Sequence, residues 1–163
     1  MTDLQTLIRL LSDAKVEYIL VGGVAAVAHG SARLTQDLDI VYDRSVQNIR
    51  RIIRVLAPYR PYLRGAPPGL PFIWDEQTIY RGLNFTLTTS LGDIDLLGEI
   101  VGGGTFKDLL PHCITLKVFG IECYCLNLDK LIEVKRAAGR PRDLESIAEL
   151  EVIREQAHGK NPE

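Results

Sequence analysis

Two aspartates, Asp37 and Asp39, flank Leu38 and are followed by Ile40 and Val41, and this short pattern constrains the chain most strongly. Residues two apart on a β-strand point to the same face of the sheet, so the two carboxylates are expected side by side. Adjacent carboxylates repel each other unless a cation lies between them. Mg²⁺ prefers oxygen ligands and also binds phosphate, so the pair predicts a magnesium site.

A glycine pair precedes these aspartates. Gly22 and Gly23 follow a predicted strand at 18–21 and precede a predicted slim helix of small residues at 24–28. A glycine pair fits a simple strand-to-helix turn, but it also lets the backbone approach a ligand, and free N–H groups at a helix start suit phosphate. With the aspartates following, the pair predicts phosphate binding. Arg33 and Thr35 lie in the connection between this helix and the aspartate-bearing strand. They are either ligands of the phosphate or the base, or residues of an ordinary loop.

Helical and strand patterns interleave along the rest of the chain without strict alternation. Apolar periodicity predicts helices at 4–15, 46–57, 105–110, 128–138 and 141–156, and strands at 84–89, 93–97, 114–118 and 121–126. The strands at 84–89 and 93–97, and those at 114–118 and 121–126, are each joined by a short turn and are expected to form two antiparallel hairpins. We therefore expect an α/β (α+β) fold with a mixed sheet and helices packed on it. One domain is expected, with a core at 1–126, a C-terminal helical pair at 127–157 and a flexible tail at 158–163.

The segment 58–71 holds five prolines and two glycines, which predicts a long loop. Long loops in small domains are usually functional or mobile, and this one is a candidate cover for a cleft.

Charge and cysteine content narrow the function classes. The 163 residues include 19 basic and 21 acidic side chains, a balance that disfavours a general nucleic-acid coat protein. The three cysteines fit a reduced, cytoplasmic protein better than a disulfide scaffold. Charged residues near the start, and the lack of 18 consecutive uncharged apolar residues, predict neither a signal peptide nor a membrane span.

A third carboxylate is expected to complete the site. Phosphoryl and nucleotidyl transfer require two divalent ions, held by about three carboxylates, to neutralise a triphosphate. Asp95 lies between Ile94 and Leu96 on a predicted strand, and it can serve as third ligand or as base for an acceptor hydroxyl. Asp93 shares its strand face but also fits a turn carboxylate after Gly92.

These motifs together resemble a known superfamily. Gly22-Gly23, thirteen intervening residues, Asp37-Leu38-Asp39-Ile40 and a later lone Asp95 resemble the signature of polymerase-β-like nucleotidyltransferases. The resemblance is closest to small bacterial members, the minimal nucleotidyltransferases and AbiEii-type toxins. The run 131–150 is similar to the helical ending of that family.

The resemblance implies a mixed sheet of about five strands and transfer of a nucleoside monophosphate to an acceptor hydroxyl, with release of pyrophosphate. It places an NTP, with ATP expected, across Gly22-Gly23, and Mg²⁺ on Asp37 and Asp39. Many members have serine where this chain has Gly23, which offers phosphate only its N–H. The basic patch Lys135, Arg136, Arg140 and Arg142 either contacts phosphate or acceptor, with Lys135 as the nucleotide ligand, or lies in solvent.

Two alternatives stay open at this point. The chain can be a catalytically degenerate nucleotide-binding or toxin–antitoxin regulatory protein of the same fold, or a structural interaction domain with solvated aspartates. The acceptor is open as well: a tRNA end, a protein hydroxyl or a small molecule. The enzyme hypothesis depends on one geometry, the approach of Asp95 to Asp39.

Overall fold

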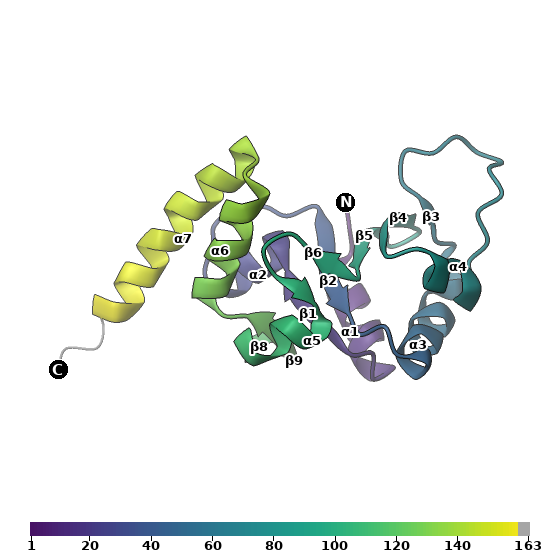
Figure 1. Cartoon of the computed structure of the whole chain (residues 1–163), viewed down its shortest axis with the longest axis horizontal. Helices are drawn as coiled ribbons and strands as arrows, with labels where there is room; N and C mark the ends of the chain where they lie inside the picture. Colours follow the sequence, from purple (N-terminus) through teal and green to yellow (C-terminus); the bar gives the residue numbers. More distant parts are fainter. Residues whose placement is uncertain (160–163) are drawn as a thin grey trace.

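A mixed sheet forms the centre of the computed structural model, which describes residues 1–159 (Figure 1). The strands are β1 (Tyr18–Val21), β2 (Asp37–Tyr42), β3 (Tyr62–Leu63), β4 (Asn84–Thr89), β5 (Gly92–Leu97), β6 (Glu99–Ile100), β7 (Gly104–Thr105), β8 (Cys113–Val118) and β9 (Ile121–Leu126). Seven of them form one sheet in the order β3-β4-β5-β2-β1-β9-β8, and β6 pairs with β7 separately. The expected mixed sheet is confirmed, with seven strands rather than about five.

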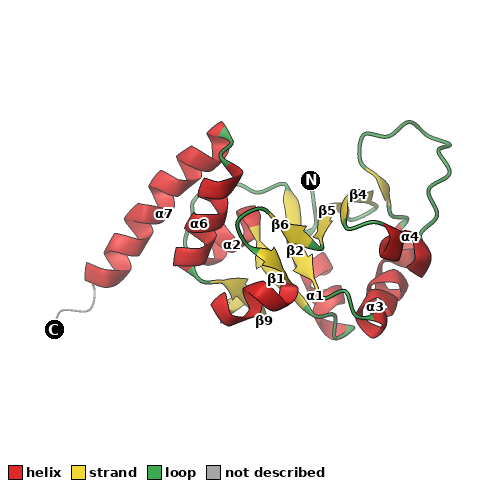
Figure 2. Cartoon of the chain, viewed as in Figure 1, coloured by secondary structure: helices red, strands yellow, loops and turns green. Residues whose placement is uncertain are grey.

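Helices flank the sheet (Figure 2). They are α1 (Leu4–Asp13), α2 (Gly22–Ala28), α3 (Val46–Leu56), α4 (Glu76–Arg81), α5 (Phe106–Leu109), α6 (Leu128–Ala138) and α7 (Pro141–Gly159). Side chains of Asp3, Ser45 and Asn127 accept backbone N–H groups at the starts of α1, α3 and α6, as helix-capping residues do. None of the helices in residues 1–159 has the length and apolar composition needed to cross a bilayer.

The strand order places the two aspartate-bearing strands together. β2 lies between β1 and β5, antiparallel to β1 and parallel to β5. In the parallel pair, Asp39 is the register partner of Asp95, and Asp37 is the partner of Asp93. Leu38 is fully buried on the opposite face, so alternation along β2 separates a packed face from a polar face.

Three local features differ from the sequence-based expectations. α2 begins at Gly22, so the glycine pair forms its first turn instead of preceding it. The proline-rich segment contains the short edge strand β3, which pairs with β4, before the chain runs out into the long loop at the upper right of Figure 1. α7 continues to Gly159, so residues 158 and 159 of the expected tail are helical, and 160–163 lie outside the described residues.

A buried asparagine joins α3 to the ends of β1 and β2. Asn48 is fully buried, and its Oδ1 accepts the N–H of Glu17 at 2.7 Å. Its Nδ2 donates to the carbonyl of Glu17 at 3.0 Å and to that of Asp43 at 2.7 Å. One side chain therefore satisfies three backbone groups, which are costly to bury unpaired.

Asn48→Ala is expected to lower the free energy of unfolding by about 2–4 kcal/mol, because it removes the partner of the Glu17 N–H and of the Asp43 carbonyl, while the Glu17 carbonyl keeps the N–H of Asp43. Urea denaturation measures the change. The adjacent exposed residue provides the control: Gln47→Ala should stay within about 0.5 kcal/mol of the wild type. A similarly small loss for Asn48→Ala would show that water replaces the side chain and that this connection is dispensable.

Candidate active site

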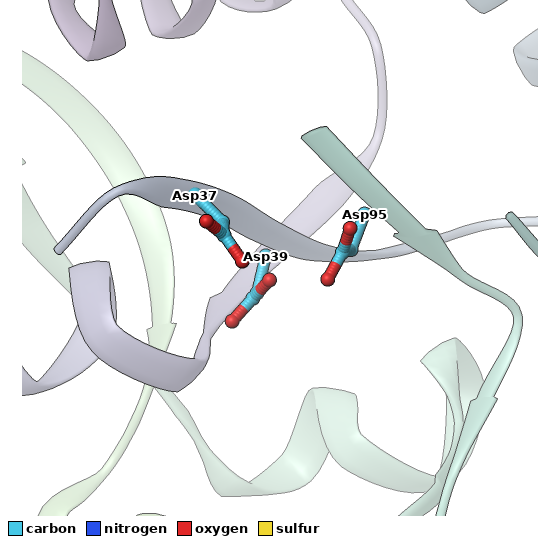
Figure 3. Close-up of side chains that lie close together, drawn as sticks. All are labelled: Asp37, Asp39 and Asp95. Atoms are coloured by element: carbon cyan, nitrogen blue, oxygen red, sulfur yellow. The ribbon is translucent and has the colours of Figure 1, made fainter. Parts of the chain in front are cut away.

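Three carboxylates meet on the polar face of β2 and β5. Asp37, Asp39 and Asp95 each place a carboxylate oxygen within 4.8 Å of the others. Figure 3 shows Asp37 and Asp39 on one strand and Asp95 on the neighbouring strand, with the three side chains directed to the same side. The parallel pairing makes this possible, since it aligns Asp39 with Asp95 and keeps both on one face. The approach of Asp95 to Asp39 that the enzyme hypothesis required is therefore present.

The chemistry of this cluster fits a divalent cation. The Oδ1 atom of Asp39 is buried and has no hydrogen-bond partner within the described residues, 1–159. Burial, together with the neighbouring Asp95 and Asp37, raises the pKa of Asp39 to about 8. A bound cation would offset both the burial and the mutual repulsion of the carboxylates. A donor set made of carboxylate oxygens suits Mg²⁺, so the three residues fit the ion that the resemblance implies.

The raised pKa of Asp39 predicts a pH-dependent stability in the presence of a chelator. Folded Asp39 keeps its proton up to about pH 8, whereas the unfolded residue loses it near its ordinary value of 3.8. The folded state therefore binds more protons between these values, and the free energy of unfolding should fall as the pH rises through them. Thermal unfolding in EDTA between pH 5 and pH 8 measures this slope.

Asp39→Asn should remove most of this slope, while Asp13→Asn, at an exposed position, should keep it. An unchanged slope in Asp39→Asn would assign the pH dependence to other groups.

The glycine pair packs directly against the site. Gly22 has φ +65°, and a Cβ built there would lie 2.9 Å from Cγ of Asp39 and overlap its carboxylate. A Cβ on Gly23 would lie 2.6 Å from Oγ1 of Thr35. Thr35 in turn donates from Oγ1 to the carbonyl of Asp37 at 3.0 Å. The absence of side chains at both glycines thus lets α2 close onto β2 and the segment before it.

A cavity of about 490 Å³ opens in front of the carboxylates. The sequence-predicted site residues all line it: Gly22, Gly23, Arg33, Thr35, Asp37, Asp39, Asp95 and Lys135. Its walls come from α2, the connection to β2, the sheet, and the facing residues of α6 and α7. The C-terminal helical pair therefore forms part of the cavity.

The basic patch divides between the cavity and the surface. Lys135, on α6, lines the cavity, and burial lowers its pKa while the nearby Asp143 and Asp39 oppose that shift. Arg140 and Arg142 also line the cavity, and Arg140 donates from Nε to the buried Asp143 at 2.7 Å. Arg136 instead pairs with Glu151 at 2.7 Å on the outside of the helical pair. The cavity is therefore lined by basic side chains as well as by the carboxylate cluster.

Arg33 is held by α7. Its guanidinium lies 3.4 Å from Glu145 and 3.7 Å from Glu149. The same Glu149 accepts hydrogen bonds from the Ser31 hydroxyl and the Ala32 N–H. These contacts pair the guanidinium of Arg33 with two glutamates of α7. Its role as a nucleotide ligand stays a prediction.

Sequence reasoning missed Arg64, which reaches the carboxylates from the proline-rich segment. Its Nη2 lies 2.8 Å from Oδ1 of Asp95, its Nε 3.3 Å from Oδ2 of Asp93, and its Nη1 3.7 Å from Oδ2 of Asp37. Asp93 thus pairs with an arginine and lies outside the three-carboxylate cluster. No local pattern marked Arg64, because its partners lie between 27 and 31 positions away in the chain.

Comparison with known proteins gives matches in structure alone. No family model and no curated protein matches the sequence. The lincosamide antibiotic adenylyltransferase LnuA, solved with lincomycin bound, matches with a TM-score of 0.62 at 18% identity, covering 92% of this chain and 95% of LnuA. TM1012 of Thermotoga maritima, a proposed nucleotidyltransferase, matches with a TM-score of 0.52 at 15% identity, covering 98% of this chain and 96% of that one.

The chain has a nucleotidyltransferase fold. The polymerase-β-like fold that the motif resemblance implied is therefore confirmed. Both matches span nearly the whole of each chain, so the nucleotidyltransferase fold here includes the helical pair α6 and α7. The AbiEii-type resemblance stays a prediction.

Proposed function

We propose that this chain is a Mg²⁺-dependent nucleotidyltransferase that moves a nucleoside monophosphate from an NTP, expected to be ATP, to a hydroxyl group of a small molecule. The observation that carries the proposal is the meeting of Asp37, Asp39 and Asp95 in a cavity that Lys135 also lines. The nucleotidyltransferase neighbours support nucleotide transfer as the general reaction.

Each site residue has a chemical task in this proposal. Asp37, Asp39 and Asp95 would hold Mg²⁺, and the bound ion would neutralise phosphate charge and make the α-phosphorus more electrophilic. Lys135 and the backbone N–H groups of Gly22 and Gly23 bind the phosphate oxygens, with Thr35 beside them. Lys135 is suited to this task because its ammonium faces the same cavity as the carboxylates.

The transfer forms one bond and breaks one bond. The acceptor oxygen bonds to the α-phosphorus, and the bond between that phosphorus and the bridging oxygen to the β-phosphate breaks. The electron pair leaves on pyrophosphate, and the acceptor hydroxyl proton passes to the carboxylate of Asp95. The half-buried position of Asp95, with 20% of its side chain exposed, keeps this carboxylate accessible from the cavity.

Two observations favour a small-molecule acceptor over tRNA or a protein. LnuA, which matches over nearly its whole length, was solved with the small molecule lincomycin bound. The balance of 19 basic and 21 acidic residues also lacks the excess of positive charge expected for a large nucleic-acid footprint.

The intact set of three carboxylates favours an active enzyme over a degenerate one, and no observation supports a toxin–antitoxin partner. Three free cysteines fit the cytoplasm.

Acceptor labelling tests the proposal. The protein is incubated with Mg²⁺, each of four α-labelled NTPs and a cell lysate, which is then separated into small-molecule, RNA and protein fractions. Label from ATP is expected in the small-molecule fraction. Label in RNA or protein would overturn the acceptor class, and Mg²⁺-dependent label in no fraction, with no thermal shift by any NTP, would overturn the enzyme.

A further inference from the structure

A single arginine crosses the sheet edge to reach the carboxylate cluster. The N–H of Arg64 donates to the carbonyl of Thr86 at 3.0 Å, which fixes its backbone beside β4. Its side chain then passes over β4, donating to the carbonyl of Leu87 at 2.7 Å, and ends among Asp95, Asp93 and Asp37. The backbone is anchored, whereas the guanidinium is held only by its side-chain contacts.

Two of these three partners belong to the proposed metal ligands. The guanidinium lies 2.8 Å from an Asp95 oxygen and 3.7 Å from an Asp37 oxygen, and those two residues also contribute oxygens to the 4.8 Å cluster. A dication held by Asp37 and Asp95 would therefore lie close to a guanidinium that keeps both contacts. Like charges at such separations repel, and repulsion is strong in a half-buried site.

The guanidinium is also imperfectly held. Its Nε is buried and makes no hydrogen bond in the part of the chain that the structure describes, although Oδ2 of Asp93 lies 3.3 Å away. The side chain remains 26% exposed, so part of it already contacts solvent. An imperfectly bonded, partly exposed arginine can leave at a smaller cost than a fully paired buried one.

We propose that Arg64 is a resident counter-cation that competes with the divalent ion for Asp37 and Asp95. This inference rests on the metal site of the proposed function. Arg64 stabilises the carboxylates of Asp37, Asp93 and Asp95, and the ion displaces its guanidinium from the two that belong to the cluster, Asp37 and Asp95. Competition of this kind sets the metal concentration at which the site becomes competent.

Mn²⁺ titration by calorimetry tests the competition, because Mn²⁺ uses the same oxygen ligands as Mg²⁺. Arg64→Gln is expected to bind Mn²⁺ about tenfold more tightly than the wild type, since one positive charge is removed from the site. Arg60→Gln is the matched control: it removes an exposed arginine of the same segment, which forms no ion pair within residues 1–159, and should leave the affinity unchanged.

The thermal unfolding temperature of the same variants, measured with and without Mn²⁺, is a second test of the competition. In EDTA, Arg64→Gln should unfold at a lower temperature than the wild type, because the carboxylates lose their counter-charge, and saturating Mn²⁺ should abolish that difference. If Arg64→Gln fails to fold, Arg64→Lys serves instead, because it keeps the charge but lacks the planar guanidinium that contacts several carboxylates at once. It is expected to bind Mn²⁺ about two- to threefold more tightly than the wild type.

The outcomes separate this inference from the proposed function. Equal or weaker Mn²⁺ binding in the Arg64 variants would overturn the competition and make Arg64 a positioning residue that holds Asp95 for the ion. If neither the wild type nor the Arg64 variants bind Mn²⁺, the metal site is overturned, and the proposed function with it.

Discussion

Asp39→Asn is expected to lower the rate of nucleotidyl transfer by at least about a thousandfold, which corresponds to about 4 kcal/mol of transition-state stabilisation. Asp39 belongs to the same cluster as Asp37 and Asp95, and its buried Oδ1 has no hydrogen-bond partner among residues 1–159. Asparagine keeps the shape of the side chain and removes its charge. The fold should therefore persist while ion binding is lost.

The measurement is the initial rate of pyrophosphate release, with Mn²⁺ affinity measured in parallel. Asp93→Asn is the informative control, because Asp93 lies on the same face of β5 but outside the three-carboxylate cluster. It should change the rate by less than about tenfold. Equal losses in the two variants would show that the site needs a diffuse negative charge rather than three defined ligands.

Gly22→Ala is expected to lower the free energy of unfolding by about 2–4 kcal/mol, combining left-handed backbone strain with overpacking. Gly22 has φ +65°, and the added Cβ would overlap the carboxylate of Asp39. Because the overlap falls on a proposed ion ligand, transfer should also fall by more than about a hundredfold, as small displacements of reacting groups are costly.

Gly120→Ala separates these two effects. Gly120 has φ +77°, close to that of Gly22, but a Cβ there would have no neighbour within 4 Å among residues 1–159. This control should cost only about 1 kcal/mol in urea denaturation and leave transfer unchanged. If Gly22→Ala behaved like Gly120→Ala in both assays, contact between the first turn of α2 and Asp39 would not matter to the site.

Local patterns predicted the parts of the site that depend on local geometry. Alternation placed Asp37 and Asp39 on one strand face and Asp95 on the face of another strand, and the structure has all three there. Periodicity does not state which strands are neighbours, so the pairing of β2 with β5 had to come from the fold. The enzyme hypothesis required that pairing without predicting it, and the observed register, with Asp39 opposite Asp95, provides it.

The features that sequence reasoning missed depend on contacts between distant segments. Arg64 lies among prolines and glycines, where the pattern predicted only a loop, yet it reaches Asp95, 31 positions away. Arg33 lines the cavity as a predicted nucleotide ligand, and its contact with Glu145, 112 positions away on α7, had no signal in the local sequence. The partners of a long side chain are residues that the folded topology brings near it. Local sequence propensities do not predict these contacts.

The most direct test of the proposed reaction follows two labels of ATP. The wild type and Asp39→Asn are incubated with Mg²⁺, a small-molecule extract, and ATP labelled at either the α- or the γ-phosphate. Nucleotidyl transfer at the aspartate cluster predicts α-label in an acceptor and γ-label in pyrophosphate, with both signals absent in Asp39→Asn. Transfer of γ-label to the acceptor, or α-label transfer that survives in Asp39→Asn, would contradict it.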